Sequence, residues 1–383
     1  MIAEVLVRYF HYSRLERSRG ASYSWSSFRN DYVRETFKID SECSFLDTIV
    51  PHPYLGFVHR NSLCGSSNNR GFVGANIPLE RDPDFFTILI VGGSVAEQMA
   101  IGVKGVSWLE KELNARYISP NGKPFKILNG AVGDWGFPNQ NTIVTLYGDV
   151  ADGIVTLDGY NEASRISEFA PVGKPDVWTY QSVVGAGFTP TVIGIRVLQY
   201  IRRQALHWAL IKHSFLSFFI FERFMAVVEN SGNQNKYQQE NLFRFFDFPA
   251  DWAKEKRRAW NKEKYKTYLR LLRAEAEALN LHYAHFLQPM RGIGKELTEE
   301  EKSYKEFVSV DDYKGVIAVA NDELKKSGYP TYSLLHIFKD EKGVIYGDHI
   351  HCKYTPDWES PGYAIMGRAI ANDLSEAWKL KTK

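Results

Sequence analysis

Short, continuously apolar runs alternate with longer amphipathic stretches through much of this chain. The four runs cover 87–91, 125–130, 153–158 and 281–287. Runs of this length predict strands that are buried on both faces, as in a parallel sheet. The predicted helices cover 94–117, about 138–149, 251–278 and 362–379. Strands that alternate with helices in this way predict a parallel α/β fold.

The alternation predicts one α/β domain over 81–383, a three-layer sandwich with a flavodoxin-like parallel sheet. Residues 1–80 have no clean period and are rich in turn formers, so we expect an irregular N-terminal extension there. The rhythm is interrupted at about 165–275, where we expect a helical insertion. Residues 332–338 fit either a short strand or a loop.

The predicted insertion carries an apolar stretch over 215–221, inside a helical segment over 192–228, and then a basic helix. A charge run of this kind is usually a solvated helix face. The apolar stretch is more often a helix packed on the sheet. The alternative is that 192–228 forms a substrate lid or makes peripheral contact with a membrane surface.

Composition excludes several classes of protein. The chain has 383 residues, 44% hydrophobic and 24% charged, which is ordinary for a globular protein and excludes a disordered, collagen-like or coiled-coil chain. Lys+Arg number 47 against 45 Asp+Glu, so a net charge of +2 gives no global attraction to nucleic acid. Aromatic residues make up 14% of the chain, which suits contacts with sugars or lipids but is explained as well by a large aromatic core.

The three cysteines are Cys43, Cys64 and Cys352, an odd and low count without metal-ligand spacing. We therefore expect no metal site and no disulfide framework, and the pairing of Cys43 with Cys64 stays open. Residues 1–8 lack the basic start and long apolar stretch of a signal peptide. No segment has the roughly 18 uncharged apolar residues of a spanning helix. The default expectation is a cytoplasmic protein, with an N-terminal anchor preceding these residues left open.

Candidate chemistry lies where the predicted strands end. Ser94 follows the first strand, Gly133 the second and Asn161 the third. The carboxyl ends of parallel strands meet at the edge where open α/β sheets bind ligands. Ser94 offers a hydroxyl there, Gly133 an unobstructed N–H and Asn161 an amide donor. In isolation each has a plainer explanation: a phosphate-binding or ordinary loop, a turn glycine, and a helix N-cap.

A fourth signal, Gly347-Asp348-His349-Ile350-His351, precedes the last helix. Asp348 and His351 are three residues apart, so on one helical turn or in a tight loop they fall on the same side. The carboxylate can then hold the imidazole while its other nitrogen faces a serine. His349 competes with His351 as base or metal ligand, but no third ligand has metal-site spacing. Taken alone, such histidines are more often surface or core residues.

Together the four signals resemble the SGNH (GDSL-like) hydrolase superfamily, over about 85–162 and 280–380. The resemblance implies a catalytic triad and an oxyanion hole. The triad residues would be the nucleophile Ser94, the base His351 and its partner Asp348. The oxyanion donors would be Ser94, Gly133 and Asn161.

The chain also departs from the common pattern of that superfamily. Gly93 stands where an aspartate is usual, and Glu162 stands where an aspartate usually follows the asparagine. The upstream segment Asn69-Arg70-Gly71-Phe72 is similar to the lead-in of bacterial members whose first block reads Gly-Gly-Ser. Neither departure removes a reacting group, so they bear on subfamily and substrate more than on chemistry.

The resemblance implies a serine esterase that needs no metal or organic cofactor. Ser94 would attack an ester carbonyl, His351 would accept and return the proton, and Asp348 would orient the imidazole. Because the base must be neutral, activity should fall below about pH 6. We favour a short-chain, acetyl-like ester on a carbohydrate or other small molecule as the substrate.

Two other functions stay open. An acyltransferase would move an acetyl group onto a glycan with the same residues. A non-catalytic module would bind a glycan or a membrane surface through the insertion. The tryptophans of the insertion either stack on sugars or simply pack; they are Trp178, Trp208, Trp252 and Trp260. The presence of all five expected site residues favours an enzyme.

Overall fold

The structure is a computed structural model that describes residues 48–61, 67–103, 105–174, 208, 214, 216–221, 223–224 and 247–383. The chain divides into two compact units. One contains 1–51, 61–65 and 177–244, and within it residues 216–221 are helical. The other contains 52–60, 66–176 and 245–383 and holds the sheet. The predictions about Cys43, Cys64, Trp178 and most of 192–228 fall outside the described residues.

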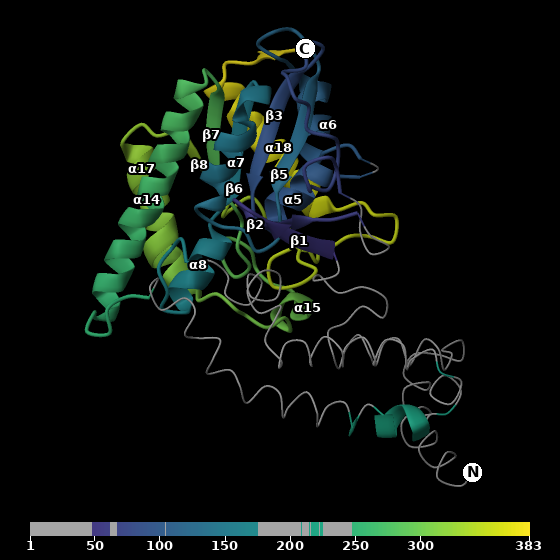
Figure 1. Ribbon diagram of the computed structural model, residues 1–383, viewed down its shortest axis with the longest axis vertical. Helices are drawn as coiled ribbons and strands as arrows, with labels where there is room; N and C mark the ends of the chain where they lie inside the picture. Colours follow the sequence, from purple (N-terminus) through teal and green to yellow (C-terminus); the bar gives the residue numbers. More distant parts are fainter. Residues whose placement is uncertain are drawn as a thin grey trace. The chain divides into compact units, whose positions relative to one another are not determined.

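The sheet unit is built on five parallel strands (Figure 1). They are β3 (Phe86–Gly92), β5 (Phe125–Ala131), β6 (Gly153–Asp158), β7 (His282–Leu287) and β8 (Thr331–Ser333). Their order is β5-β3-β6-β7-β8. Counted along the chain this is 2-1-3-4-5, the flavodoxin-like order. The predicted fold class is confirmed, and β3 and β6 are buried along their whole length as their apolar runs require.

Helices cover both faces of the sheet, which makes the three layers (Figure 1). One layer contains α5 (Ser94–Ile101), α6 (Trp108–Arg116) and α18 (Pro361–Ala377). The other contains α7 (Asn139–Tyr147), α8 (Tyr160–Ser167), α14 (Lys254–Ala278) and α17 (Val319–Lys326). The shorter elements are β1 (Ile49–His52), β2 (Gly56–His59), β4 (Tyr117–Ile118), η2 (Gly148–Val150), α15 (Glu299–Lys302), α16 (Val310–Asp312), η6 (Tyr313–Ala318) and β9 (Lys381–Thr382).

The helix predicted over 94–117 is two helices, because the backbone turns at Gly102 after α5. Gly102 has a φ of 62°, in the left-handed region that glycine adopts without strain. A side chain at this position would collide with the backbone carbonyl of Val106. The ambiguous segment 332–338 is only partly extended, since β8 ends at Ser333.

The basic helix that we assigned to the insertion is α14, and it belongs to the sheet unit. Its face toward the core is apolar and includes Tyr265 and Leu269, both fully buried. Two of its lysines are not simply solvated, because Lys262 and Lys266 each lie 2.6 Å from a carboxylate oxygen of Glu323 on α17. The interruption of the sheet unit therefore covers 177–244 rather than all of 165–275. Among the described helices, none has the length and apolarity needed to cross a membrane.

Candidate active site

The sheet register brings the first three candidate loops together. β3 ends at Gly92, which lies beside Ala131 at the end of β5 and beside Leu157 near the end of β6. The chain leaves all three strands at the same edge, so the segments that carry Ser94, Gly133 and Asn161 are neighbours. Ser94 is the first residue of α5, so its backbone N–H has no partner within the helix.

Three side chains form a continuous hydrogen-bonded chain at this edge. The Oγ atom of Ser94 is 2.7 Å from Nε2 of His351. The Nδ1 atom of the same ring is 2.7 Å from Oδ2 of Asp348. The side chains of His351 and Asp348 are 23% and 44% exposed, so a substrate in solvent can reach them. Nucleophilic catalysis needs a base within hydrogen-bond distance of the nucleophile and a third group that orients the base. These three side chains have that geometry.

The Asp348 carboxylate is held in its charged form. Burial alone would raise its pKa, but the hydrogen bond and the charge of His351 together with two backbone N–H donors lower it well below its usual value. Those donors are the N–H groups of Ile350 and His351, 2.8 and 2.7 Å from Oδ1. A carboxylate that accepts several hydrogen bonds is stabilised as the anion. Asp348 therefore presents a fixed negative charge to the imidazole.

The loop that carries Asp348 and His351 is anchored by a buried glutamate. Glu301 accepts hydrogen bonds from the backbone N–H groups of Ile345 and Tyr346 at 2.9 and 3.0 Å. Its other carboxylate oxygen is 2.7 Å from Nζ of Lys295, and both side chains are fully buried. Sequence reasoning missed this residue. Its signal is the Thr298-x-x-Glu301 pattern of a capping box, which the structure contains.

His349, the alternative base, packs among aromatic rings. Its ring centroid is 4.7 Å from that of Phe307 and 5.8 Å from that of Tyr160. Cys352, on the other side of His351, is buried, and burial raises the pKa of its thiol. Across the described part of the chain, no three His, Cys, Asp or Glu side chains gather as a metal site.

The expected oxyanion donors differ in what they contact. The Asn161 amide nitrogen donates to the Trp135 carbonyl at 2.7 Å, which leaves its second N–H for another acceptor. The Gly133 N–H donates to Oε2 of Glu97 at 3.1 Å. The glycine predicted to face an oxyanion is therefore engaged by a carboxylate from α5. Sequence reasoning did not single out Glu97.

The departure at Gly93 has a steric cause. A Cβ atom at this position would collide with the amide nitrogen of Asn161 and would lie 3.0 Å from the carbonyl oxygen of Trp135. The close approach of Gly93 to Asn161 brings the serine turn and the asparagine together. The aspartate that the sequence resemblance led us to expect here does not fit without displacing Asn161.

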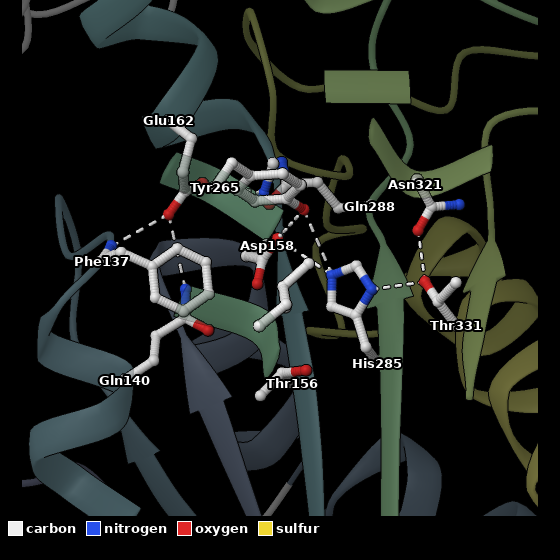
Figure 2. Close-up of polar contacts among 12 residues, drawn as sticks. Phe137, Gln140, Thr156, Asp158, Glu162, Tyr265, His285, Gln288, Asn321 and Thr331 are labelled. Carbon is white, nitrogen blue, oxygen red and sulfur yellow. Dashed lines mark hydrogen bonds and ion pairs between the residues drawn. The ribbon is translucent and has the colours of Figure 1, made fainter. Parts of the chain in front are cut away.

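Glu162, the second departure, belongs to a buried polar cluster (Figure 2). The Glu162 carboxylate accepts from the N–H of Gly159 at 2.9 Å and from that of Phe137 at 3.1 Å. Nearby, Asp158 accepts from the hydroxyl of Tyr265 at 2.6 Å and lies 3.1 Å from His285. Burial, followed by the negative charge of Asp158, raises the pKa of Glu162 to about 8. Glu162 thus ties the segment after β5 to the turn that precedes Asn161.

A cavity of about 310 Å³ adjoins the Asp348–His351 pair. Its lining is largely polar and consists of Gln98, Gly347, Asp348, His351, Cys352, Lys353 and Tyr354. Gln98 follows Ser94 by four residues on α5 and therefore shares its helix face.

The ring centroid of Trp358 is 6.2 Å from that of Tyr354. Trp358 is 73% exposed and has a φ of 63°, an unfavourable conformation for a bulky side chain.

The structure describes three of the tryptophans singled out in the sequence. Trp252 and Trp260 both pack on Phe248, with ring centroids 5.4 and 5.2 Å from its ring. Trp208 is 56% exposed in the other unit.

Comparison with known proteins gave matches among solved structures only. No protein-family model matches the chain, and no curated protein does. A lipase/acylhydrolase from Enterococcus faecalis is 11% identical, with a TM-score of 0.37, covering 78% of this chain and 98% of its own. A catalytic mutant of an acetylxylan esterase from Geobacillus stearothermophilus is 10% identical, with a TM-score of 0.36, covering 75% and 93%. A GDSL-like lipase from Bacteroides thetaiotaomicron is 10% identical, with a TM-score of 0.31, covering 76% and 89%. These three solved structures are described as a lipase/acylhydrolase, an acetylxylan esterase and a GDSL-like lipase, which are names of ester hydrolases.

Proposed function

We propose that this protein is a serine ester hydrolase of the SGNH type. The observation that carries the proposal is the hydrogen-bonded chain from Ser94 through His351 to Asp348, with both links at 2.7 Å. Asp348 lies 254 positions after Ser94 in the sequence, and His351 lies 257 positions after it. Buried cores do not need such an arrangement, and its partly exposed position at the carboxyl edge of the sheet suits catalysis.

In the proposed mechanism, the Ser94 oxygen attacks the ester carbonyl while Nε2 of His351 takes the hydroxyl proton. Asp348 holds the proton on Nδ1 and stabilises the imidazolium. His351 then gives its proton to the leaving alcohol, and the bond from the carbonyl carbon to that alcohol breaks. Water attacks the resulting acyl-enzyme with His351 again as base. This releases the acid and restores the serine.

The charge that develops on the carbonyl oxygen needs preorganised donors. We assign the backbone N–H of Ser94 and the second amide N–H of Asn161 to this role. The Gly133 N–H is not assigned, because it donates to Glu97. Loss of one oxyanion donor typically costs a factor of about 10²–10³ in kcat.

The cavity beside the triad supports a small polar ester as the substrate. Its volume of about 310 Å³ is at the lower end of the range for small-molecule sites, roughly 300–1,000 Å³. Polar side chains in the wall and the exposed ring of Trp358 next to Tyr354 suit a sugar ring, which presents hydroxyls at its edge and an apolar face. We therefore propose a short acyl group, acetyl-like, on a carbohydrate or similar small alcohol.

The test is hydrolysis of 4-nitrophenyl acetate, butyrate and octanoate at about pH 8, where a histidine base is neutral. We expect the wild-type protein to cleave the acetate best and Ser94→Ala to abolish turnover. Ser375→Ala, at the end of α18, is the matched control and should leave kcat unchanged.

A folded wild-type protein that cleaves none of these esters, with or without an added sugar alcohol as acyl acceptor, would refute the proposal. Turnover that survives in Ser94→Ala would assign the reaction to another residue. Product that appears only with the sugar acceptor would make the protein an acyltransferase instead of a hydrolase.

A further inference from the structure

A second histidine–carboxylate pair lies next to the serine turn and has no part in the mechanism above. Nε2 of His59, at the end of β2, is 2.6 Å from Oε1 of Glu97 on α5. The two side chains are each 11% exposed. The other carboxylate oxygen of Glu97 accepts the Gly133 N–H at 3.1 Å. Glu97 thus joins three segments that are distant in the sequence.

The segment after β5, residues 132–137, is held at three points. Glu97 holds it at Gly133, Asn161 donates to the carbonyl of Trp135, and Glu162 accepts from Phe137. We call this segment the oxyanion loop. Because Asn161 bonds to Trp135, the direction of its amide depends on where the loop lies.

Glu97 also links this loop to α5, the helix that begins with the nucleophile Ser94. Ser94 and Glu97 are three residues apart on α5, so both lie on the same side of the helix. Gly93 has no room for a side chain, so a carboxylate cannot act from that position. One helical turn later there is room, and Glu97 reaches the loop from there.

We propose that Glu97 is a positioning residue for the oxyanion hole and that His59 fixes its carboxylate. Glu97 holds Gly133, the loop then places the Trp135 carbonyl, and that carbonyl orients the Asn161 amide toward the reacting oxygen. This inference rests on the proposed hydrolase function. Hydrogen bonds of N–H donors to a carboxylate are stronger than those to neutral acceptors, which suits a fixed anchor.

The test compares Glu97→Ala, Glu97→Gln and His59→Gln with the wild type, using 4-nitrophenyl acetate. We expect Glu97→Ala to lower kcat by about 10- to 100-fold with KM within about twofold, since a misdirected oxyanion donor loses transition-state binding only. Glu97→Gln should recover most of that loss, because its amide oxygen can accept the Gly133 N–H while its NH₂ group faces His59. The kcat of His59→Gln should lie between those of Glu97→Ala and Glu97→Gln.

Glu110→Ala is the matched control. Glu110 lies on α6 and accepts the backbone N–H of Ile127 at 2.8 Å, the same type of contact away from the triad. Its loss should lower the thermal stability without changing kcat. An equal loss of kcat in Glu110→Ala and Glu97→Ala would overturn the proposal, as would a kcat that is unchanged in Glu97→Ala. A Glu97→Gln variant as impaired as Glu97→Ala would do so too.

A second readout does not need enzyme activity. With glycine labelled by ¹⁵N, the amide of Gly133 can be assigned by its loss in Gly133→Ala. We expect its proton signal to move upfield in Glu97→Gln, because a hydrogen bond to a neutral acceptor is weaker. An unmoved signal would overturn the inference even in an active enzyme. If the signal moves but no ester is cleaved, the contact stands and the proposed function fails.

Discussion

Replacing Asp348 with asparagine tests the proposed triad most directly. The two side chains have the same shape, and the amide oxygen of the variant can still accept the N–H groups of Ile350 and His351. The amide NH₂ then faces Nδ1 of His351 in place of Oδ2. Because that group donates, the imidazole proton moves to Nε2 and points at Ser94. The base is then in the wrong tautomer to accept the serine proton.

The magnitude follows from the charge that is lost. An imidazolium and a carboxylate whose charges are about 4 Å apart attract by roughly 4 kcal/mol at an effective dielectric constant of about 20. Asp348 is 44% exposed, so solvent screening reduces this to about 2 kcal/mol. That alone is a factor of about 30 in kcat. The wrong tautomer adds to it, and the same change in serine-protease triads costs about 10⁴.

We therefore expect Asp348→Asn to lower kcat for 4-nitrophenyl acetate by between about 30- and 10⁴-fold, with KM little changed. Asp340→Asn, an exposed aspartate outside the triad loop, is the control and should match the wild type. Circular dichroism and thermal melting verify that the variant is folded. A folded Asp348→Asn that loses less than about fivefold in kcat would refute the assignment of Asp348.

Four further predictions concern stability and specificity. Glu162 has a pKa raised from 4.5 to about 8, so between pH 4.5 and about pH 8 the folded protein keeps a proton that the unfolded chain loses. The free energy of unfolding should therefore fall as the pH rises through this window. Thermal melts of Glu162→Gln should show a smaller fall. Glu301 has a pKa lowered to about 2, so its contribution to the free energy of unfolding should be complete above pH 4.5 and be lost as the pH falls toward 2. Glu301→Gln should cost about 3–5 kcal/mol in urea unfolding at neutral pH, because Lys295 is left buried without its partner, and a loss under about 1 kcal/mol would contradict this. Trp358→Gly should remove about 1 kcal/mol of left-handed strain and yet raise KM for an acetylated xylo-oligosaccharide, with no change for 4-nitrophenyl acetate; equal effects on both substrates would exclude a sugar contact.

The sequence by itself determined the sheet and singled out the residues that we propose react. Continuous apolar runs predicted β3, β5, β6 and β7 because a strand that is covered on both faces carries apolar side chains on both of them. Ser94 was found because it follows such a run directly. The Asp348–His351 pair was found because a spacing of three residues lets two side chains meet within one loop.

Only the tertiary structure decided how these groups are held. Glu97 meets His59 and Gly133 from 38 and 36 residues away, and Glu301 meets Ile345 from 44 residues away. Local periodicity predicts which face of an element is buried. It does not predict which distant backbone N–H a glutamate will contact. That pairing depends on how whole elements pack. It arises because a buried carboxylate must find donors wherever the packed chain supplies them.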